Sequence, residues 1–439
     1  MRKSWWWTAT LAGTVTAVVV AGGVAGAQQG VAGQQAARQS SAQQERPGAE
    51  QPVLRQVATV SYPAPEKTPA SFDIGWVDPD TQTYYLADHT NNGVDAVNAK
   101  TDAFESVIGA GDFTGSGATA TAAQKAACGS HGTGGPDGVL SLDVGGVRQV
   151  WAGDGVDAAS PASTIKVFDV ATPGSGTLAA TISTGGICRA DELAYDPADH
   201  LVLMANDVDS PPFISLISVH PDPARDTVVK KITFPDAIDG IEQSAYDPGT
   251  GMFYVNIPQV PASDGTWRGE VAQINPRTMS VVRTFPVTGC SPGGLAIDTA
   301  SQRMLLGCSG DAVSGDTVGG VTYHPNPAVS VIMNARDGHI VSTFRQVGGS
   351  DEVWFDPPSG TYYLAASNMT SNGESTGYPT PVLGVIAAGP SRSHGAVGRW
   401  LGNFPTAASA HSVAANPVNG QVFVPIPGYG IAVFAAARQ

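Results

Sequence analysis

A short sequence motif recurs along the chain, and carboxylate or imidazole side chains stand at a fixed distance before most of its copies. The motif ends in Asp-Pro at 76–79, 194–197, 245–248 and 354–357, and weaker copies lie at 141–144, 296–299 and 414–417. Anchored on the Asp or Asn, successive copies are 51 to 65 residues apart. Five positions before the anchors stand Asp73, Gly138, Asp191, Glu242, Gly293, Asp351 and His411, with Asp137, Glu192 and Glu352 one position from this register.

Acidic side chains that converge in a fold can hold a cation. Carboxylates at close range raise one another's pKa values unless a positive charge neutralises them. Oxygen-rich clusters suit Ca²⁺ or Mg²⁺ better than softer metals. We therefore predict a divalent cation at Asp73, Asp191, Glu242 and Asp351. The alternative is that these side chains point into solvent, or cap their own turns, in an already acidic protein.

The same positions supply candidate acid–base groups. His411 carries an imidazole, whose ordinary pKa lies near neutrality, and Glu242 and Asp191 are the carboxylates considered with it as a catalytic base. The sequence contains no H-E-x-x-H or C-x-x-C-H pattern and no phosphate-cradling motif with Lys. It therefore indicates no nucleotide, haem or flavin cofactor.

Short strands must position these residues, because each repeat divides into four apolar segments separated by turn residues. The third repeat divides at 191–197, 201–208, 213–219 and 227–235, and helical periodicity is absent from the chain after residue 27. Repeats of about fifty residues indicate a closed repeat architecture. The six complete repeats are 73–109, 136–184, 191–235, 241–288, 292–347 and 350–405.

The last repeat lacks one strand. Its three segments are 411–416, 421–425 and 430–436, whereas a spare apolar strand, 53–62, precedes the first repeat. Pairing the two would leave no open sheet edge. The prediction is an all-β, seven-bladed β-propeller that is closed by an N-terminal strand completing the last blade. Six or eight blades are the main alternatives.

Four cysteines indicate two disulfide bonds in an exported protein. Four cysteines allow three pairings. Cys290 precedes an inner strand and Cys308 ends the adjacent second strand, whereas Cys128 lies in an insertion before the second repeat and Cys188 precedes the third. The expected pairs are Cys290–Cys308 and Cys128–Cys188.

The chain begins with features of a signal peptide. Arg2 and Lys3 precede an apolar run, and Ala25-Gly26-Ala27 offers a cleavage site. We expect a signal peptide at 1–27, a disordered Gln/Ala/Ser-rich spacer at 28–52 and the propeller domain at 53–439. A membrane anchor at the start is the alternative to cleavage. The mature chain is expected to be secreted, extracellular or periplasmic, with no membrane span and as a monomer.

The charge balance excludes one class of partner. The sequence has 23 Lys and Arg residues against 38 Asp and Glu residues, and its net charge is −15. Nucleic-acid binding needs clustered basic side chains, and no such cluster occurs. The expected partner is a small molecule or a protein.

The segment 84–101, Tyr-Tyr-Leu-Ala-Asp-His-Thr-Asn-Asn-Gly-Val-Asp-Ala-Val-Asn-Ala-Lys-Thr, resembles a YVTN-type β-propeller repeat. Partial echoes lie at 203–207 and 164–169. Members of this family include surface-layer and binding proteins, and related propellers include lactonases and lyases. The leading prediction is a secreted binding or interaction module, because the sequence predicts a rigid ring with a loop-rich mouth and shows no recognisable catalytic constellation. The alternatives are a metal-dependent, lactonase-like hydrolase or lyase, or a structural protein of the cell envelope.

Long loops supply the expected binding surface. The Gly-, Ser- and Thr-rich insertions are 110–135, 309–328 and 369–381. Long loops in a compact domain are often functional. If these connections share one mouth of the channel, a small molecule or protein would bind there.

Overall fold

The computed structural model describes residues 54–129, 132–263, 265, 267–309, 317–318, 321–322, 327–371, 378–390 and 397–436. The expected signal peptide and spacer lie outside the described residues. Most of the 309–328 insertion and part of the 369–381 insertion also lie outside them.

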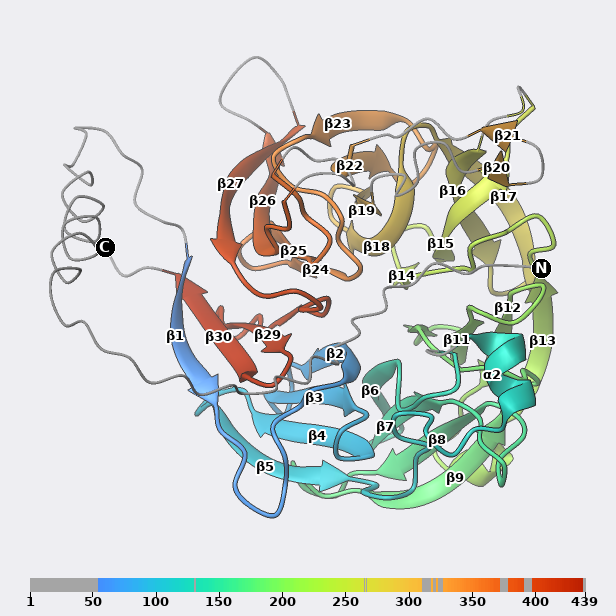
Figure 1. The fold of residues 1–439 in the computed structure, drawn as a ribbon, viewed down its shortest axis with the longest axis vertical. Coiled ribbons are helices and arrows are strands. Elements are labelled where there is room, and N and C mark those ends of the chain that lie inside the picture. Colours follow the sequence, from blue (N-terminus) through green and yellow to red (C-terminus); the bar gives the residue numbers. More distant parts are fainter. Residues whose placement is uncertain are drawn as a thin grey trace, which may run out of the picture. The chain divides into compact units, whose positions relative to one another are not determined.

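Seven four-stranded antiparallel sheets surround a central channel, which confirms the predicted seven-bladed β-propeller (Figure 1). Each sheet is a blade, numbered here by its order in the chain. Blade 1 is β2 (Phe72–Asp78), β3 (Thr83–Asp88), β4 (Gly93–Asn98) and β5 (Ala103–Ile108). Blade 2 is β6 (Val139–Val144), β7 (Val147–Asp154), β8 (Thr164–Asp169) and β9 (Thr177–Ser183). Blade 3 is β10 (Leu193–Asp196), β11 (Leu201–Asn206), β12 (Phe213–Ser218) and β13 (Val228–Thr233).

The next three blades repeat this order from the inner to the outer strand. Blade 4 is β14 (Ser244–Asp247), β15 (Met252–Pro261), β16 (Trp267–Asn275) and β17 (Ser280–Val287). Blade 5 is β18 (Ser291–Asp298), β19 (Arg303–Ser309), β22 (Val329–Asn334) and β23 (Ile340–Phe344). The short strands β20 (Thr317–Val318) and β21 (Val321–Thr322) pair outside it. Blade 6 is β24 (Val353–Asp356), β25 (Thr361–Ala366), β26 (Val382–Pro390) and β27 (Val397–Pro405).

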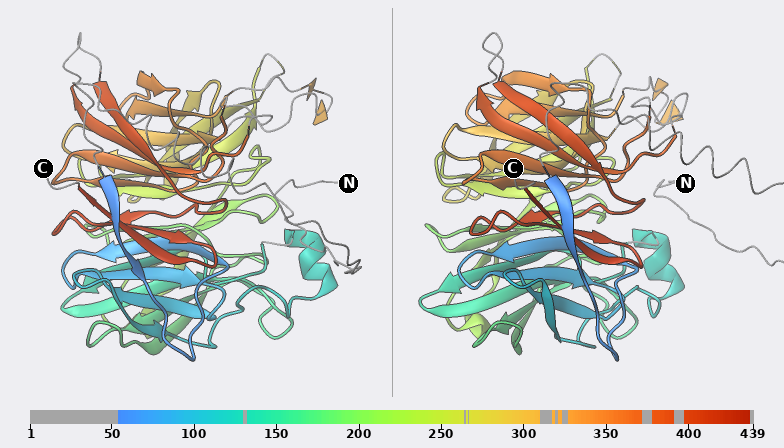
Figure 2. Two further views of the ribbon diagram at one scale, coloured as in Figure 1. Left: turned by 60° about the vertical axis from the view of Figure 1, so that its left-hand side comes forward. Right: turned by 90° about the vertical axis from the view of Figure 1, so that its left-hand side faces the viewer.

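Blade 7 joins the two ends of the domain. It contains β28 (Ala414–Ala415), β29 (Val422–Ile426) and β30 (Gly430–Ala436), and its outermost strand is β1 (Leu54–Val60). β1 runs antiparallel to β30, with Leu54 opposite Ala436 and Val60 opposite Ile431 (Figure 2). The last sheet therefore reaches four strands by using a strand from the other end of the domain.

The recurring Asp is a turn former. Asp78 Oδ1 accepts hydrogen bonds from the backbone N–H groups of Asp80 and Thr81, and Asp196 Oδ1 accepts them from Ala198 and Asp199. An Asp carboxylate that binds the backbone two and three residues ahead fixes the tight turn between the first two strands of a blade. Equivalent bonds are made by Asp247, Asp298 and Asn416.

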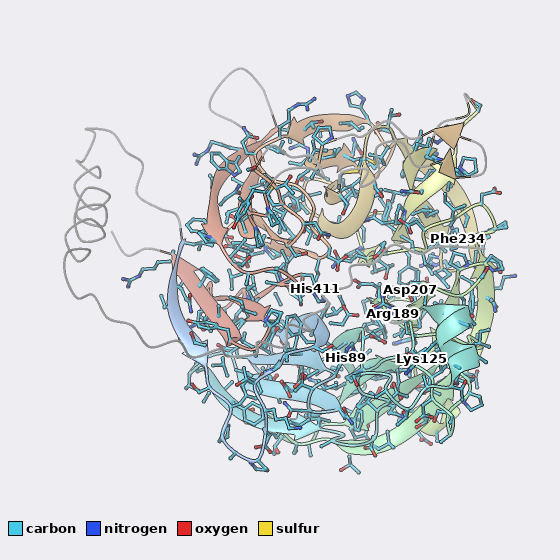
Figure 3. All side chains as sticks on the ribbon, in the orientation of Figure 1. His89, Lys125, Arg189, Asp207, Phe234 and His411 are labelled. Atoms are coloured by element: carbon cyan, nitrogen blue, oxygen red, sulfur yellow. A yellow bond between two sulfur atoms is a disulfide. The ribbon has the colours of Figure 1, made fainter. Side chains whose placement is uncertain are left out.

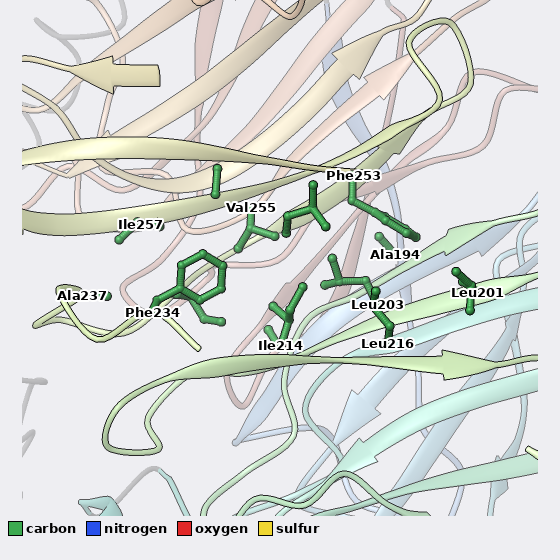
Figure 4. Close-up of a cluster of buried hydrophobic side chains, with 14 of the residues drawn as sticks. Ala194, Leu201, Leu203, Ile214, Leu216, Phe234, Ala237, Phe253, Val255 and Ile257 are labelled. Atoms are coloured by element: carbon green, nitrogen blue, oxygen red, sulfur yellow. The ribbon is translucent and has the colours of Figure 1, made fainter. Parts of the chain in front are cut away.

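The core lies between neighbouring blades. Leu203 and Ile214 of blade 3 pack with Phe253 and Val255 of blade 4, and all four side chains are fully buried (Figure 4). The strands are apolar on both faces because each blade is covered by a neighbour on each side. Shortening one such side chain, as in Leu203→Ala, would cost about 2–5 kcal/mol.

One element departs from the all-β expectation. The insertion before blade 2 contains α2 (Ala122–Cys128), which the sequence analysis did not predict. Thr121 and Gln124 form a capping box at its start, and this stabilises a seven-residue helix that lacks a long apolar periodicity. A further 3₁₀ turn, η1, spans Pro223–Arg225. Within the described residues, no helix has the length and apolar character needed to cross a membrane.

Candidate functional site

Arg189 lies at one mouth of the channel, in a nest of Asp side chains that we call the Arg189 nest (Figure 3). Its guanidinium Nη1 is 3.0 Å from Asp73 Oδ2 and 3.8 Å from Asp137 Oδ1. Nη2 is 2.5 Å from Asp191 Oδ2 and 2.8 Å from Asp207 Oδ2. These four carboxylates come from blades 1, 2 and 3, so the ion pairs link three neighbouring blades.

Local hydrogen bonds hold the loop that carries Arg189. The backbone N–H groups of Ile187 and Cys188 donate to the carboxylate of Asp209, at 3.1 and 3.3 Å. Thr184 Oγ1 donates to Asn206 Oδ1 at 2.6 Å. Asp209 and Asn206 both follow the core of β11, so the loop between blades 2 and 3 is fixed to the second strand of blade 3.

Two histidines flank the Arg189 nest. His89 Nε2 is 3.0 Å from Asp137 Oδ1, and His411 Nε2 is 3.3 Å from Asp73 Oδ1. The His411 ring also stacks on Phe72, with centroids 5.2 Å apart. Burial opposes protonation of His411, but the hydrogen bond and charge of Asp73 outweigh it and raise its pKa to about 9. Since this imidazole is protonated at neutral pH, it is a poor general base there.

The carboxyl groups of the nest differ in how readily they ionise at neutral pH. Burial disfavours ionisation of Asp73, but the His411 hydrogen bond and the Arg189 charge outweigh it, so its pKa is strongly lowered. At Asp137, desolvation by burial dominates and raises the pKa to about 7. One guanidinium therefore does not keep every carboxyl group of the nest ionised at neutral pH.

The four predicted metal ligands do not form one compact set. Asp73 and Asp191 both contact Arg189, whereas Glu242 and Asp351 make no side-chain hydrogen bond or ion pair among the residues described. Across the described chain, one group of three ligating side chains has its donor atoms within 4.8 Å of one another: Asp73, His89 and Asp137. Arg189 Nη1 already contacts two of these three, so a guanidinium lies where a metal ion would bind.

A second acidic group, Glu192, Glu242 and Asp351, lies beside the Arg189 nest, and we call it the open carboxylate group. Desolvation by burial raises the pKa of Glu242, and the charge of Asp351 raises it further. Burial likewise raises the pKa of Glu192, with added repulsion from Glu352, Asp73, Asp351 and Glu242. The charge of Asp351 therefore acts on both Glu192 and Glu242.

Glu352 differs from its neighbours because it has protein donors. Its Oε2 accepts hydrogen bonds from Ser412 Oγ at 2.6 Å and from the Val413 N–H at 2.9 Å. Desolvation by burial nevertheless raises its pKa to about 8. Glu352 is therefore mostly protonated at neutral pH and joins blade 6 to blade 7 as a structural hydrogen-bonding group.

Two tryptophans meet further along the inner strands. Trp76 of β2 and Trp354 of β24 meet edge to face, with ring centroids 5.1 Å apart. Both residues stand two positions before the anchor Asp of their repeat, whereas Asp73 and Asp351 of the same repeats stand five positions before it.

Both predicted disulfide bonds are present. Cys128 is bonded to Cys188, 60 residues apart in the chain, and Cys290 to Cys308, 18 residues apart. The first bond ties α2 to the residue immediately before Arg189. The second joins the start of blade 5 to the end of β19.

Sequence reasoning missed Arg189 because the register selected acidic positions on the inner strands. Arg189 lies two residues before Asp191, in the connection between blades. A search for basic residues would have found it. Arg189 is the single Lys or Arg in the seven positions before any anchor: 71–77, 136–142, 189–195, 240–246, 291–297, 349–355 and 409–415.

Comparisons with known proteins support the fold. No protein-family model and no curated protein matches the chain. A structure of Kuenenia stuttgartiensis hydrazine synthase matches with a TM-score of 0.57 at 12% identity, over 85% of this chain and 98% of that one. A chain in a crystal structure of the mitotic checkpoint complex matches with a TM-score of 0.52 at 13% identity, over 90% and 98%. At these identities the likeness shows a β-propeller fold, and YVTN-type repeat membership stays a prediction.

Proposed function

We propose that the protein is a secreted interaction module that binds a cationic ligand at the channel mouth. The propeller fold supports an interaction or scaffold role, because a rigid ring presents loops from several blades at one face. The observation that carries the proposal is the open carboxylate group. No ion pair to Glu192, Glu242 or Asp351 is present among the described residues, whereas Arg189 pairs directly with their neighbours; His411 and Arg189 act on this group only through their charges.

A cationic ligand would relieve an electrostatic cost that the free protein carries. Desolvation disfavours the ionised forms of Glu192, Glu242 and Asp351, and repulsion from other carboxylates adds to it, whereas Arg189 partly offsets it at Glu242 and both His411 and Arg189 do so at Asp351. A positive charge among them favours ionisation and replaces repulsion by attraction. A bound cation lowers the pKa values of these carboxyl groups. Binding is therefore expected to release protons from the protein, and more protons the larger the fall in pKa.

Calorimetric titration at low ionic strength tests the proposal. The probes are CaCl₂, MgCl₂ and a short basic peptide, each titrated into the parent protein and into a Glu242→Gln, Asp351→Asn double variant. We expect at least one cation to bind the parent and to bind the double variant at least about tenfold more weakly. Absence of binding by all three cations would overturn the proposal.

The secreted location has separate support and a separate test. Two disulfide bonds suit an oxidising compartment. N-terminal sequencing of the protein recovered from culture medium or periplasm is expected to begin at Gln28. Retention of the protein in the cytoplasm with an intact N-terminus would contradict secretion.

A metal-dependent hydrolase or lyase is the second candidate function. The observation that favours it is the Asp73, His89 and Asp137 group, whose imidazole suits a transition metal better than Ca²⁺. Against it stands Arg189, which a metal ion would have to displace from Asp73 and Asp137. Elemental analysis of protein purified without chelator tests it: about one metal ion per chain, lost in His89→Gln, would favour this function.

A further inference from the structure

Ser71, His89 and Asp137 form a chain of hydrogen bonds at the channel mouth (Figure 3 labels His89). Ser71 Oγ is 3.1 Å from His89 Nδ1, and His89 Nε2 is 3.0 Å from Asp137 Oδ1. Ser71 lies just before β2, His89 just after β3 and Asp137 two residues before β6, so two blades contribute. A hydroxyl, an imidazole and a carboxylate in this order are the groups that carry out nucleophilic acyl transfer on several unrelated folds.

Exposure falls along this chain of hydrogen bonds. Ser71 is exposed to solvent, the His89 side chain is 12% exposed, and the Asp137 side chain is fully buried. A substrate can therefore reach the hydroxyl group, while the carboxylate is shielded from water. A shielded carboxylate interacts more strongly with an imidazole than an exposed one does.

Backbone hydrogen bonds hold the serine beside the imidazole. Thr90, which directly follows His89, accepts at Oγ1 from the N–H groups of Ala70 and Ser71, at 2.9 and 3.0 Å. Its own N–H donates to the Ser71 carbonyl at 3.2 Å. On the other side, the Asp137 carbonyl accepts from the Ile74 N–H at 3.1 Å, which joins the segment before blade 2 to the inner strand of blade 1. The three side chains thus stand on backbone that is fixed relative to one another, as acyl transfer requires.

The proton positions follow from the partners of the ring. An ionised Asp137 only accepts, so the ring hydrogen lies on Nε2 and the lone pair of Nδ1 faces the Ser71 hydroxyl. The two nitrogens have exchanged the places they take in serine proteases, but the ring carries a proton between the same two neighbours in either orientation. Ser71 Oγ makes no other hydrogen bond among the described residues, so its proton has one protein acceptor.

Asp137 also increases the basicity of the imidazole. Burial lowers the pKa of His89, but the hydrogen bond and charge of Asp137 outweigh it, so this pKa is raised. In its neutral form, His89 is therefore a stronger base toward the Ser71 hydroxyl than a free imidazole.

The surrounding charge restricts the substrate. Asp137 belongs to the Arg189 nest, in which four carboxyl groups share one guanidinium, and the chain as a whole has a net charge of −15. This field repels an anionic substrate and favours release of a carboxylate product. Uncharged and cationic esters are therefore the expected class.

We propose that Ser71 cleaves uncharged or cationic carboxylic esters by acyl transfer, with His89 as its general base and Asp137 as the residue that positions the imidazole. Ser71 Oγ bonds to the carbonyl carbon as its proton passes to His89 Nδ1. The bond from that carbon to the alcohol oxygen then breaks, and the alcohol leaves with the proton from His89. Water repeats these steps on the acyl-serine, so one ester and one water give one carboxylic acid and one alcohol. This activity goes beyond the cation binding proposed for the mouth and does not depend on it.

Covalent labelling of the full domain tests the nucleophile. The probe is diisopropyl fluorophosphate, from which an activated serine displaces fluoride to form an oxygen–phosphorus bond. The reaction is run at about pH 8, where Asp137, whose pKa is about 7, is ionised. Peptide mass spectrometry is expected to find the label on Ser71 and at least about tenfold slower labelling in His89→Gln. Ser175 is the internal control, because it is an exposed serine whose hydroxyl contacts Thr172 and no histidine among the described residues.

Hydrolysis of p-nitrophenyl acetate tests turnover. Ser71→Ala and His89→Gln should each lower kcat/KM at least about a hundredfold. Asp137→Asn should lower kcat with little change in KM, because Asp137 touches the imidazole and not the ester. His220→Gln is the matched control. His220 pairs with Asp226 at 2.8 Å, but no serine hydroxyl contacts its other ring nitrogen among the described residues, so activity should be unchanged.

The outcomes separate this inference from the functions proposed above. Absence of the label from Ser71, or undiminished hydrolysis by Ser71→Ala, would overturn it. Hydrolysis that disappears with a chelator and returns with a metal ion would also overturn it, and would favour the metal-dependent hydrolase that uses the same imidazole. Cation binding is measured without an ester, so its result does not decide this one. Thermal melting checks that the variants fold, and the labelled position in the parent protein decides the outcome where a variant does not.

Discussion

Arg189 and Asp207 meet across two loops at the channel mouth. Both Nε and Nη2 of Arg189 contact the same oxygen, Asp207 Oδ2, at 2.9 and 2.8 Å. The remaining donor, Nη1, is thereby turned toward Asp73 and Asp137. Asp207 thus orients the guanidinium, and through it links the second strand of blade 3 to the inner strands of blades 1 and 2.

Replacing Arg189 should destabilise the ring strongly. Arg189→Gln leaves four buried carboxyl groups without their shared cation, and breaking a buried ion pair by removing one partner costs about 3–5 kcal/mol. The measurement is urea-induced unfolding at pH 7. Arg277→Gln is the control, because Arg277 forms an exposed pair with Asp199, with 75% of its own side chain exposed, and should change stability far less. Equal effects of the two substitutions would contradict a structural role for the nest.

Glu352 should make stability fall as the pH rises. Its pKa is about 8 in the folded state and near 4.5 in the unfolded chain, so the folded state holds the extra proton between these values. Stability is therefore lost as pH rises from about 4.5 to about 8, by at most about 1.4 kcal/mol per pH unit for this group. Glu352→Gln keeps an oxygen for Ser412 and Val413 and should flatten the profile in this range. Parallel profiles for parent and variant would refute the assignment.

His411 should contribute stability that disappears at high pH. Its folded-state pKa is about 9, above the ordinary 6.5, so its contribution is complete below about pH 6.5 and is lost as pH rises through about 9. His411→Gln should lower the melting temperature at pH 6.5 and much less at pH 10. His339→Gln, in the turn before β23, serves as the control. A pH-independent loss in His411→Gln would point to the Phe72 stacking alone.

Removing the Cys128–Cys188 bond should destabilise the domain more than removing Cys290–Cys308. In the chain-entropy account, the constraint on the unfolded chain grows with loop length, to about 4 kcal/mol for the longer loop and about 3 kcal/mol for the shorter one. Paired Cys→Ser variants and calorimetric melting measure the difference. The reverse order would show that local packing, rather than loop length, sets the contribution of each bond.

The fold was more predictable than the site, for a physical reason. Each blade repeats the same turn, in which Asp78, Asp196 or Asp247 caps the backbone ahead, so the sequence repeats wherever the backbone does. The site is not repeated. Its central residue, Arg189, comes from one connection between blades, and its partners Asp207 and His89 come from loops after second strands.

The carboxylates predicted from the repeat show what the position of a residue in a repeat does not reveal. Counting back from each anchor located Asp73 and Asp191, but it gave no information about which cation neutralises them. The identity of that cation depends on distances between side chains of different blades, and these distances are set by the three-dimensional fold. Helix α2 was missed for a related reason, because a capping box at Thr121 and Gln124 replaces the periodicity of a longer helix.

The pairing of β1 with β30 determines how the domain would respond to a pulling force. Leu54 lies directly opposite Ala436, so the chain enters and leaves the last blade at the same end of this strand pair. Tension applied through these two ends would load the backbone hydrogen bonds of the pair one after another, as in opening a zipper, and not all together in shear. The ring should therefore open mechanically at blade 7 under low force, while the six blades made of consecutive strands stay folded.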